Sequence, residues 1–168
     1  MILVFNTYHT TLKFGLFEKP ATGVLKSVVH GQVSNIGGQS LFEWSNGSVA
    51  ANISVELSDL EDAADWVLHW LEHLWPLGSL LEGLKIVAHR CANCSISSSS
   101  PTLIQGTLHP AIQSGAHCAV GISRERFPDD VVVVVVPAIE SDQNELAGND
   151  EEAWIARSAL KAVDASMI

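Results

Sequence analysis

The sequence is poor in basic residues. Only 9 Lys and Arg stand against 19 Asp and Glu, so the formal net charge is −10 at pH 7. Proteins that hold phosphate backbones cluster Lys and Arg, whereas the basic residues here are scattered. The composition therefore argues against a nucleic-acid partner. It leaves phosphate-bearing metabolites open, because a few well-placed donors or a metal ion suffice for them.

Cysteine is also scarce, with three in the chain. An odd count argues against a disulfide framework. Cys91 and Cys94, with His89, His117 and Cys118 nearby in the sequence, could form a zinc site, but one C-x-x-C pair without a second is a weak signal. Reduced thiols near a strand end are the favoured interpretation, and a zinc or redox module stays as an alternative.

Long apolar runs are lacking. The longest, residues 131–136, is far below the roughly 20 residues of a membrane-spanning helix. The N-terminus, residues 1–5, has neither a basic flank nor a small-residue cleavage site and predicts a strand rather than a signal peptide. We therefore expect a cytoplasmic protein with no membrane partner. The length of 168 residues fits one domain.

Apolar periodicity is what the chain does have. A capping box, Ser58-x-x-Glu61, opens a helical pattern that ends at Pro76. Six consecutive valines, residues 131–136, indicate a central parallel strand buried on both faces. Strands are predicted over residues 2–6, 12–18, 24–33, 49–57, 84–88 and 131–136, and helices over residues 58–75, 102–113, 114–127 and from Asp150 onward.

The order of these elements predicts an α/β architecture. Strands in a meander, followed by alternating helices and strands, give a mixed sheet with helices on both faces. This is the ribonuclease H-like plan, found as half of a sugar kinase, actin or acetate kinase. No internal repeat or long linker divides the chain, so residues 1–168 are expected to form a single domain.

Three segments resemble the acetate kinase family, in that family's order. Residues 2–18, ILVFNTYHTTLKFGLFE, are similar to its opening strand, N-x-G-S-S-S-L-K-F and second strand. Residues 86–90, IVAHR, resemble its strand ending in G-H-R. Residues 121–130 and the valines after them resemble its helix and the strand leading into F-D-T-A-F-H. The resemblance implies the N-terminal domain of an acetate kinase.

The C-terminal segment has two interpretations. Residues 151–157, EEAWIAR, also resemble the family's last helix, N-E-E-L-x-I-A-R, which packs back on the N-terminal domain. Residues 143–168 would then be that helix, with the segments between deleted. Alternatively, Asp150 and the acidic residues after it are simply what a helix start prefers.

Acetate kinases phosphorylate acetate from ATP with Mg²⁺ between two similar domains, and the resemblance implies roles on that basis. Arg90 would be the catalytic residue that pairs with the carboxylate or phosphoryl group, which suits a guanidinium. Glu151 would bind metal if the tail is the family's last helix. Mg-ATP would be the cofactor of an active kinase. On the phosphate and metal side, the implied residues are Asn6, Thr10, Thr11 and Lys13.

The sequence departs from the family where the chemistry takes place. Tyr8 and His9 replace the loop's Gly and Ser, and Tyr8 adds bulk where a backbone must approach phosphate. Residues 93–95 replace the family's His-Gly-Gly, and Pro137 stands where the family has its catalytic Asp. The later H-G-T-S-H, T-R-S-G-D and G-G-I-G-E-N segments have no counterpart, nor is a Walker A or G-x-G-x-x-G sequence present.

These losses favour an acetate kinase-like protein that is catalytically incompetent alone, since one missing transition-state donor costs a factor of about 10²–10³ in rate. It would be a binding or partner module, or a remnant. A small anion or carboxylate is the expected ligand, and a homodimer mate or partner chain would cover the face left by the missing domain. The alternative is an acyl-phosphate-forming kinase of acetate or short-chain carboxylates, completed by a second polypeptide or dimer mate.

Overall fold

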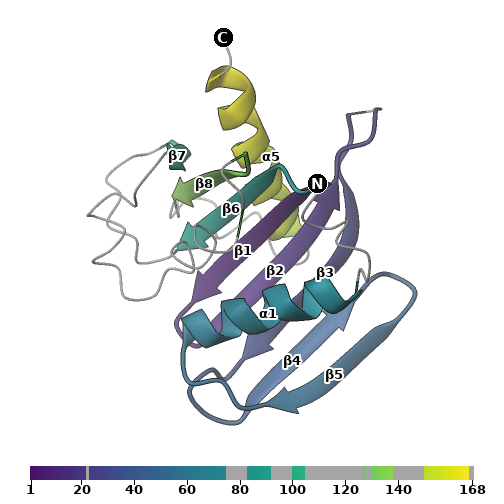
Figure 1. The fold of residues 1–168 in the computed structure, drawn as a ribbon, viewed down its shortest axis with the longest axis vertical. Helices are drawn as coiled ribbons and strands as arrows, with labels where there is room; N and C mark the ends of the chain where they lie inside the picture. The colour runs from purple at the N-terminus through teal and green to yellow at the C-terminus, as the bar shows by residue number, and fades with distance from the viewer. Residues whose placement is uncertain are drawn as a thin grey trace.

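The computed structural model describes residues 1–21, 23–74, 83–91, 100–104, 127, 130–137 and 150–166. Within them, strands form one eight-stranded sheet in the order β5-β4-β3-β2-β1-β6-β8-β7 (Figure 1). The strands are β1 (Ile2–Tyr8), β2 (Thr11–Glu18), β3 (Lys26–Ser34), β4 (Ser40–Ser45), β5 (Ala50–Val55), β6 (Ile86–Cys91), β7 (Thr102–Ile104) and β8 (Val132–Pro137). The helices are α1 (Leu60–Leu74) and α5 (Asp150–Ser166).

Strand β1 joins two differently built halves of the sheet. On one side, β1 to β5 pair in chain order, each antiparallel to the strand before it. On the other side, β1 is parallel to β6 and β6 is parallel to β8, while β7 closes the edge antiparallel to β8. The mixed α/β sheet predicted from the sequence is confirmed.

Alternate residues of the strands enter two separate hydrophobic clusters. Along β1, Leu3 and Phe5 join the cluster that contains the buried face of α1, whereas Ile2 and Val4 join the one that contains the buried residues of α5. In Figure 1, α1 crosses in front of the sheet and α5 lies behind it. Four consecutive valines of β8 are buried, which fits a strand packed on both sides.

The strands and helices differ from the prediction in several places, and β6, for example, covers Ile86–Cys91 where residues 84–88 were predicted. Residues 40–45 form β4, which was not predicted, because its alternation of Phe42 and Trp44 with Leu41 and Glu43 is short. Residues 102–104, predicted to begin a helix, form β7. In so short a segment, pairing with β8 outweighs the helix propensity of the sequence. The third strand begins at Lys26 rather than at residue 24.

Two further expectations, a helix over residues 114–127 and the lack of a membrane-spanning helix, can be compared only with the residues that the structure describes. The helix predicted over residues 114–127 lies outside the described residues except for Phe127, which is buried in the cluster with α1. Among the described residues, no helix is long and apolar enough to cross a membrane.

His89 is a titratable side chain within the core. It is fully buried on β6 and stacks on Phe5, with ring centroids 5.4 Å apart. Because its neighbour Arg90 alternates with it along the strand, the two side chains point to opposite faces of the sheet. Burial lowers the pKa of His89 from 6.5 to about 3. The imidazole is therefore neutral in the folded protein over the physiological range.

This histidine makes stability depend on pH. The unfolded chain protonates His89 near pH 6.5 and the folded chain only near pH 3, so its contribution is complete above pH 6.5 and is lost as the pH falls towards 3. Between about pH 7 and about pH 5, we expect this group to lower the free energy of unfolding by about 2 kcal/mol in urea denaturation. His89→Gln should remove that part of the dependence, whereas His9→Gln, in an exposed turn, should keep it. Identical pH profiles for His89→Gln and the parent would contradict the assignment.

Candidate functional site

Strand register places a row of polar residues across the sheet. From β6 to β5, each member of the row pairs with the next, and the row consists of Arg90, Asn6, Lys13, Gln32, Glu43 and Asn52. Along β2, Lys13 lies between Leu12 and Phe14, which belong to the cluster with α1. The polar row therefore lies on the other face, beside α5.

The first turn of α5 places the carboxylate of Glu151 over one end of this row. Arg90 Nη1 and the Tyr8 hydroxyl both donate to Glu151 Oε1. Lys13 Nζ lies 3.8 Å from Glu151 Oε2, and Arg90 Nη1 also donates to the Tyr8 oxygen at 3.0 Å. Tyr8, Lys13, Arg90 and Glu151 thus form one polar network, which we call the Glu151 cluster.

The buried Asn6 lies next to the Glu151 cluster. Its Nδ2 donates to Glu152 Oε1 at 3.4 Å, and both residues are buried. The Asn6 Oδ1 and the Arg90 Nε have no hydrogen-bond partner within the part of the chain that the structure describes. The Arg90 guanidinium carbon also lies 5.8 Å from the centre of the Trp154 ring. The site therefore holds a donor and an acceptor that a small polar ligand could satisfy.

Burial raises the pKa of the Tyr8 phenol, and its hydrogen bond to Glu151 raises it further. The Arg90 guanidinium acts in the opposite direction, because a nearby cation favours the phenolate. The phenol is thus held neutral as a donor to the carboxylate. The carboxylate that accepts this hydrogen bond is itself mostly buried, since the Glu151 side chain is 12% exposed.

The structure brings together most of the residues implied by the resemblance. Arg90, Lys13 and Glu151 meet in the Glu151 cluster, and Asn6 lies beside it, although they come from four different elements. Thr11 begins β2 opposite Tyr8. The roles of these residues remain predictions.

Other residues singled out from the sequence lie away from the Glu151 cluster or outside the residues that the structure describes. Thr10 is exposed in the turn between β1 and β2, where its carbonyl accepts a hydrogen bond from the Ile36 N–H at 3.0 Å. Pro137 ends β8 and pairs with Cys91, next to the pair formed by Arg90 and Val136. Residues 92–99 and 105–126, which include the other candidate zinc ligands, lie outside the described residues.

Sequence reasoning missed the contributions of Tyr8, Glu152 and Trp154. Tyr8 was interpreted only as added bulk in a phosphate loop, yet its hydroxyl bridges Arg90 and Glu151. The available signal was parity: Tyr8 stands two residues after Asn6 on one strand, so both side chains share a face. The resemblance implies that Glu151 binds metal if the tail is the family's last helix. In the structure its carboxylate contacts Arg90, Tyr8 and Lys13, and the metal role stays a prediction. No group of three or more His, Cys, Asp or Glu suited to a metal occurs among the described residues.

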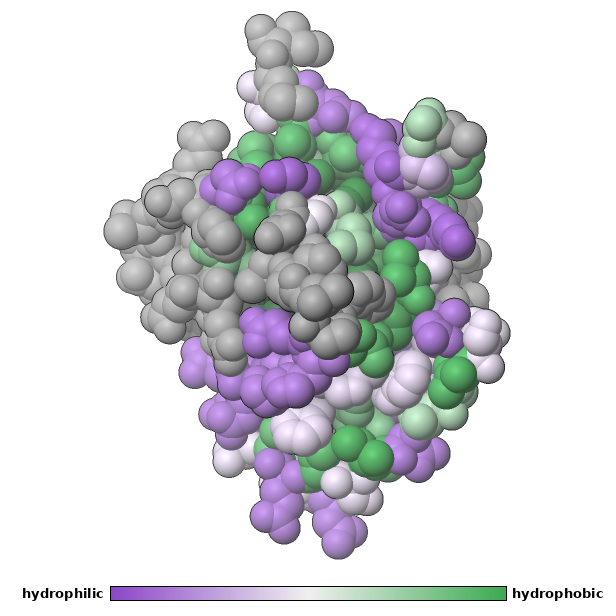
Figure 2. All heavy atoms as spheres, turned by 45° about the vertical axis from the view of Figure 1, so that its right-hand side comes forward, coloured by the Kyte–Doolittle hydropathy of each residue, from purple (hydrophilic) through white to green (hydrophobic). Residues whose placement is uncertain are grey.

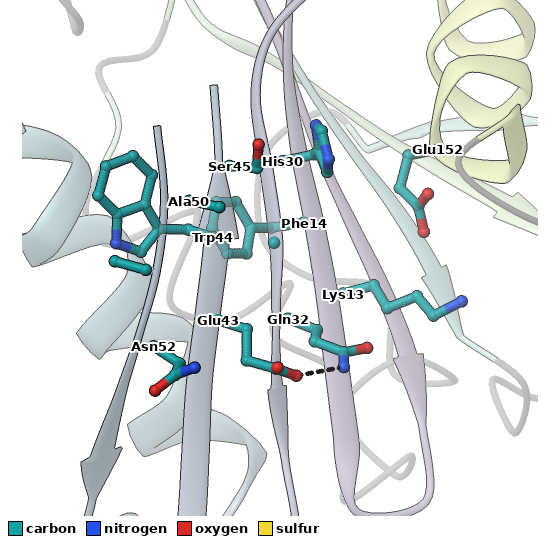
Figure 3. Close-up of a pocket in the computed structure, with 12 residues that line it drawn as sticks. Lys13, Phe14, His30, Gln32, Glu43, Trp44, Ser45, Ala50, Asn52 and Glu152 are labelled. Carbon is teal, nitrogen blue, oxygen red and sulfur yellow. Dashed lines mark hydrogen bonds between the residues drawn. The ribbon is translucent and has the colours of Figure 1, made fainter. Parts of the chain in front are cut away.

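A hollow of about 470 Å³ opens on the same face, beside the Glu151 cluster. The polar row from Lys13 to Asn52 crosses it, and Glu152 of α5 borders it (Figure 3). In Figure 3 the amino group of Lys13 and the carboxylate of Glu152 lie at one end of the hollow, and Gln32 Nε2 donates to Glu43 Oε2 at 2.8 Å. The hollow therefore offers charged groups of both signs over a sheet floor.

The fold is that of an α/β domain of the type found in acetate and propionate kinases. The acetate kinase of Porphyromonas gingivalis superposes with a TM-score of 0.63 at 18% identity, covering 81% of this chain. A propionate kinase from Francisella tularensis subsp. tularensis SCHU S4 superposes with a TM-score of 0.56 at 22% identity, covering 81% of this chain. The acetate kinase of Entamoeba histolytica gives a TM-score of 0.59 at 13% identity over 91% of this chain.

These superpositions confirm the predicted resemblance at the level of the fold. The chain spans only 36% of the P. gingivalis and F. tularensis kinases and 40% of the E. histolytica kinase. No protein-family model and no curated protein matches the sequence. The likeness to these kinases is thus a shared arrangement of strands and helices.

Tyr8 can be observed directly, because it is the only tyrosine in the chain. We expect its tyrosinate absorbance to appear at higher pH in the folded protein than in denaturant, since burial and Glu151 both favour the neutral phenol. Glu151→Gln should shift the titration to lower pH, because it removes the negative charge and leaves Arg90 nearby. Glu56→Gln, an exposed change of equal charge, should leave it unmoved. Coincident titrations of the folded parent and the Glu151→Gln variant would show that the contact does not form.

Proposed function

We propose that residues 1–168 form one acetate kinase-like domain that binds a small anion or a partner and does not transfer phosphate by itself. The observation that carries this proposal is the pairing of Arg90 with Glu151 of the same chain. The resemblance implies that the Arg90 guanidinium binds the carboxylate or phosphoryl group of a substrate. Here it already binds the carboxylate of Glu151.

Charge balance supports this proposal. Phosphoryl transfer needs cations and donors around the charge that develops on the transferred group. Arg90 and Lys13 are the cations of the Glu151 cluster, and Glu151 contacts both. Glu152 adds a second carboxylate next to Asn6. Two carboxylates thus offset two cations, and an incoming anion must compete with Glu151 for Arg90.

The strand beside Arg90 supports it as well. In the parallel pair of β6 and β8, Arg90 lies opposite Val136 and Cys91 opposite Pro137. Neither Val136 nor Pro137 can act as a proton acceptor or hold a metal. The resemblance puts the kinases' catalytic Asp at this strand end, so the general base it implies is missing from the position nearest to Arg90.

The ligand that fits this site is a small carboxylate or phosphate. It would replace the Glu151 carboxylate on Arg90 and Lys13, and the hollow beside Lys13 gives it a route of approach. A planar guanidinium binds either anion through two parallel hydrogen bonds. Asn6 Oδ1 and Arg90 Nε, which have no hydrogen-bond partner among the described residues, offer one further acceptor and one further donor.

A second candidate function is an acyl-phosphate-forming kinase completed by another polypeptide or by a dimer mate. The observation in its favour is that Asn6, Lys13 and Arg90 come together on one face of the sheet. The partner would have to supply the nucleotide contacts and displace Glu151. Mg-ATP would then be the cofactor.

Acetyl phosphate formation tests the proposal. The purified chain with Mg-ATP and acetate should give no acetyl phosphate, trapped as the hydroxamate, because Glu151 neutralises the cations and the strand positions opposite Arg90 and Cys91 carry Val136 and Pro137. Glu151→Gln should not restore turnover, since it frees Arg90 without supplying the missing groups. Turnover by the parent that Arg90→Ala abolishes would refute the proposal and support the second candidate.

Anion binding tests the displacement of Glu151. Glu151→Gln should bind acetate or inorganic phosphate about tenfold more tightly than the parent in calorimetric titrations, because the internal competitor loses its charge. Glu56→Gln changes the net charge equally at an exposed site and should bind as the parent does. Equal affinity in the Glu151→Gln and Glu56→Gln variants would show that Glu151 does not occupy the anion site.

A further inference from the structure

Strand β5 forms an unprotected edge of the sheet. It pairs with β4 alone within the described residues, so the outer backbone N–H and C=O groups of Ala50–Val55 face away from the sheet. Natural edge strands are usually blocked by charge, proline, a bulge or shortness. β5 has the sequence AANISV, with no charge and no proline, and its first five residues are exposed. By contrast, the opposite edge, β7, has only three residues.

Exposed hydrophobic side chains gather at this edge. Val49 and Ile53 are 52% and 47% exposed, and only Val24 is similarly large, apolar and exposed in the described part of the chain. Figure 2 turns the side with β5 towards the viewer, and green hydrophobic surface shows among hydrophilic residues in the lower half of the molecule. An apolar strip therefore follows the free edge.

The strip continues an internal aromatic layer. Ile53 pairs with Phe42 and Ala51 pairs with Trp44, so both β5 side chains point to the same face as these aromatic residues. On that face Trp70 of α1 packs 5.0 Å from Phe42 and 5.1 Å from Trp44, measured between ring centroids. A strand added beyond β5 would extend a packed hydrophobic layer.

The sequence around β5 has the symmetry that a second copy requires. Residues 49–55, VAANISV, are nearly palindromic about Asn52. An antiparallel pair related by a two-fold axis at Asn52 sets Val49 opposite Val55, Ala50 opposite Ser54 and Ala51 opposite Ile53. Each pair is apolar with apolar or small with small, and the large Ile53 meets the small Ala51. Asn52 meets its own copy, and two amides can donate and accept mutually.

We propose that β5 pairs antiparallel with β5 of a second copy of this chain, forming a homodimer whose sheet is continuous through both subunits. An isologous interface requires a self-complementary surface, which the palindrome provides. The arrangement also keeps acidic residues apart in a chain of net charge −10, because Glu56 would face Ser48 of the partner subunit. The polar row of each copy would meet at Asn52, and the two hollows would lie side by side.

Asn52 permits a charge-swap experiment on the full chain. At the proposed register, Asn52→Lys brings Lys against Lys and Asn52→Asp brings Asp against Asp, and like charges directly opposite destabilise a strand pair. In sedimentation equilibrium, the parent should be a dimer. Each variant alone should dissociate at least about tenfold more readily. An equimolar mixture of the two variants should recover the dimer as a heterodimer.

The controls separate this interface from general charge effects and from misfolding. Ser27→Lys, exposed on β3 away from the edge, makes the same charge change as Asn52→Lys and should leave the dimer intact. Asn52→Lys also lowers the net negative charge of both copies, so overall repulsion cannot explain its dissociation. Unchanged circular dichroism shows that the variants fold. A monomeric parent, a dimer indifferent to Asn52, or a mixture that stays monomeric would each overturn the proposal.

Discussion

The ion pair between Arg90 and Glu151 is the interaction on which the rest of the site depends. Their side chains are 3% and 12% exposed, so the pair lies mostly out of water. Charges removed from water are stable only when they are paired, and removing one partner of such a pair typically costs about 3–5 kcal/mol. The pair also connects the start of α5 to β6, although the two residues are far apart in the sequence. The position of α5 on the sheet and the neutrality of the site therefore have a common origin.

This dual role sets stability against activity. A kinase-like site needs an arginine that is fixed in position but has free hydrogen-bond donors, so that these donors can bind the transferred group. Here the first turn of α5 supplies the carboxylate, Tyr8 supplies a neutral donor to it, and Lys13 balances its other oxygen. Each contact gives the Glu151 carboxylate a partner and makes the cations less available to a ligand. Natural proteins often show this antagonism where a strained or unpaired site is filled.

Sequence reasoning located the elements with strong periodicity and missed those that depend on a partner. The valine run of β8 and the acidic start of α5 are local signals. The capping box predicted at Ser58 was one residue off, because the Asp59 carboxylate caps α1 and accepts from the N–H groups of Glu61 and Asp62. The strands β4 and β7 are short and form because a neighbouring strand offers unpaired backbone groups. Similarly, Arg90, Lys13 and Asn6 could be singled out by resemblance, whereas the neutralisation of Arg90 and Lys13 by Glu151 depends on where α5 docks. No pattern within residues 150–157 states which strand the helix start will meet.

The construction of the sheet determines the positions of the polar site and of the β5 edge. Its centre is packed on both sides, since β1 sends alternate residues into the clusters of α1 and α5. The meander extends beyond α5, and from β3 to β5 the polar row borders a hollow in the part of the chain that the structure describes. The polar face borders the hollow at the β5 end of the sheet, and the uncharged edge strand lies at the same end. The two surfaces meet at Asn52. A ligand can occupy the face, whereas the edge presents a row of backbone donors and acceptors that a further strand can pair in register.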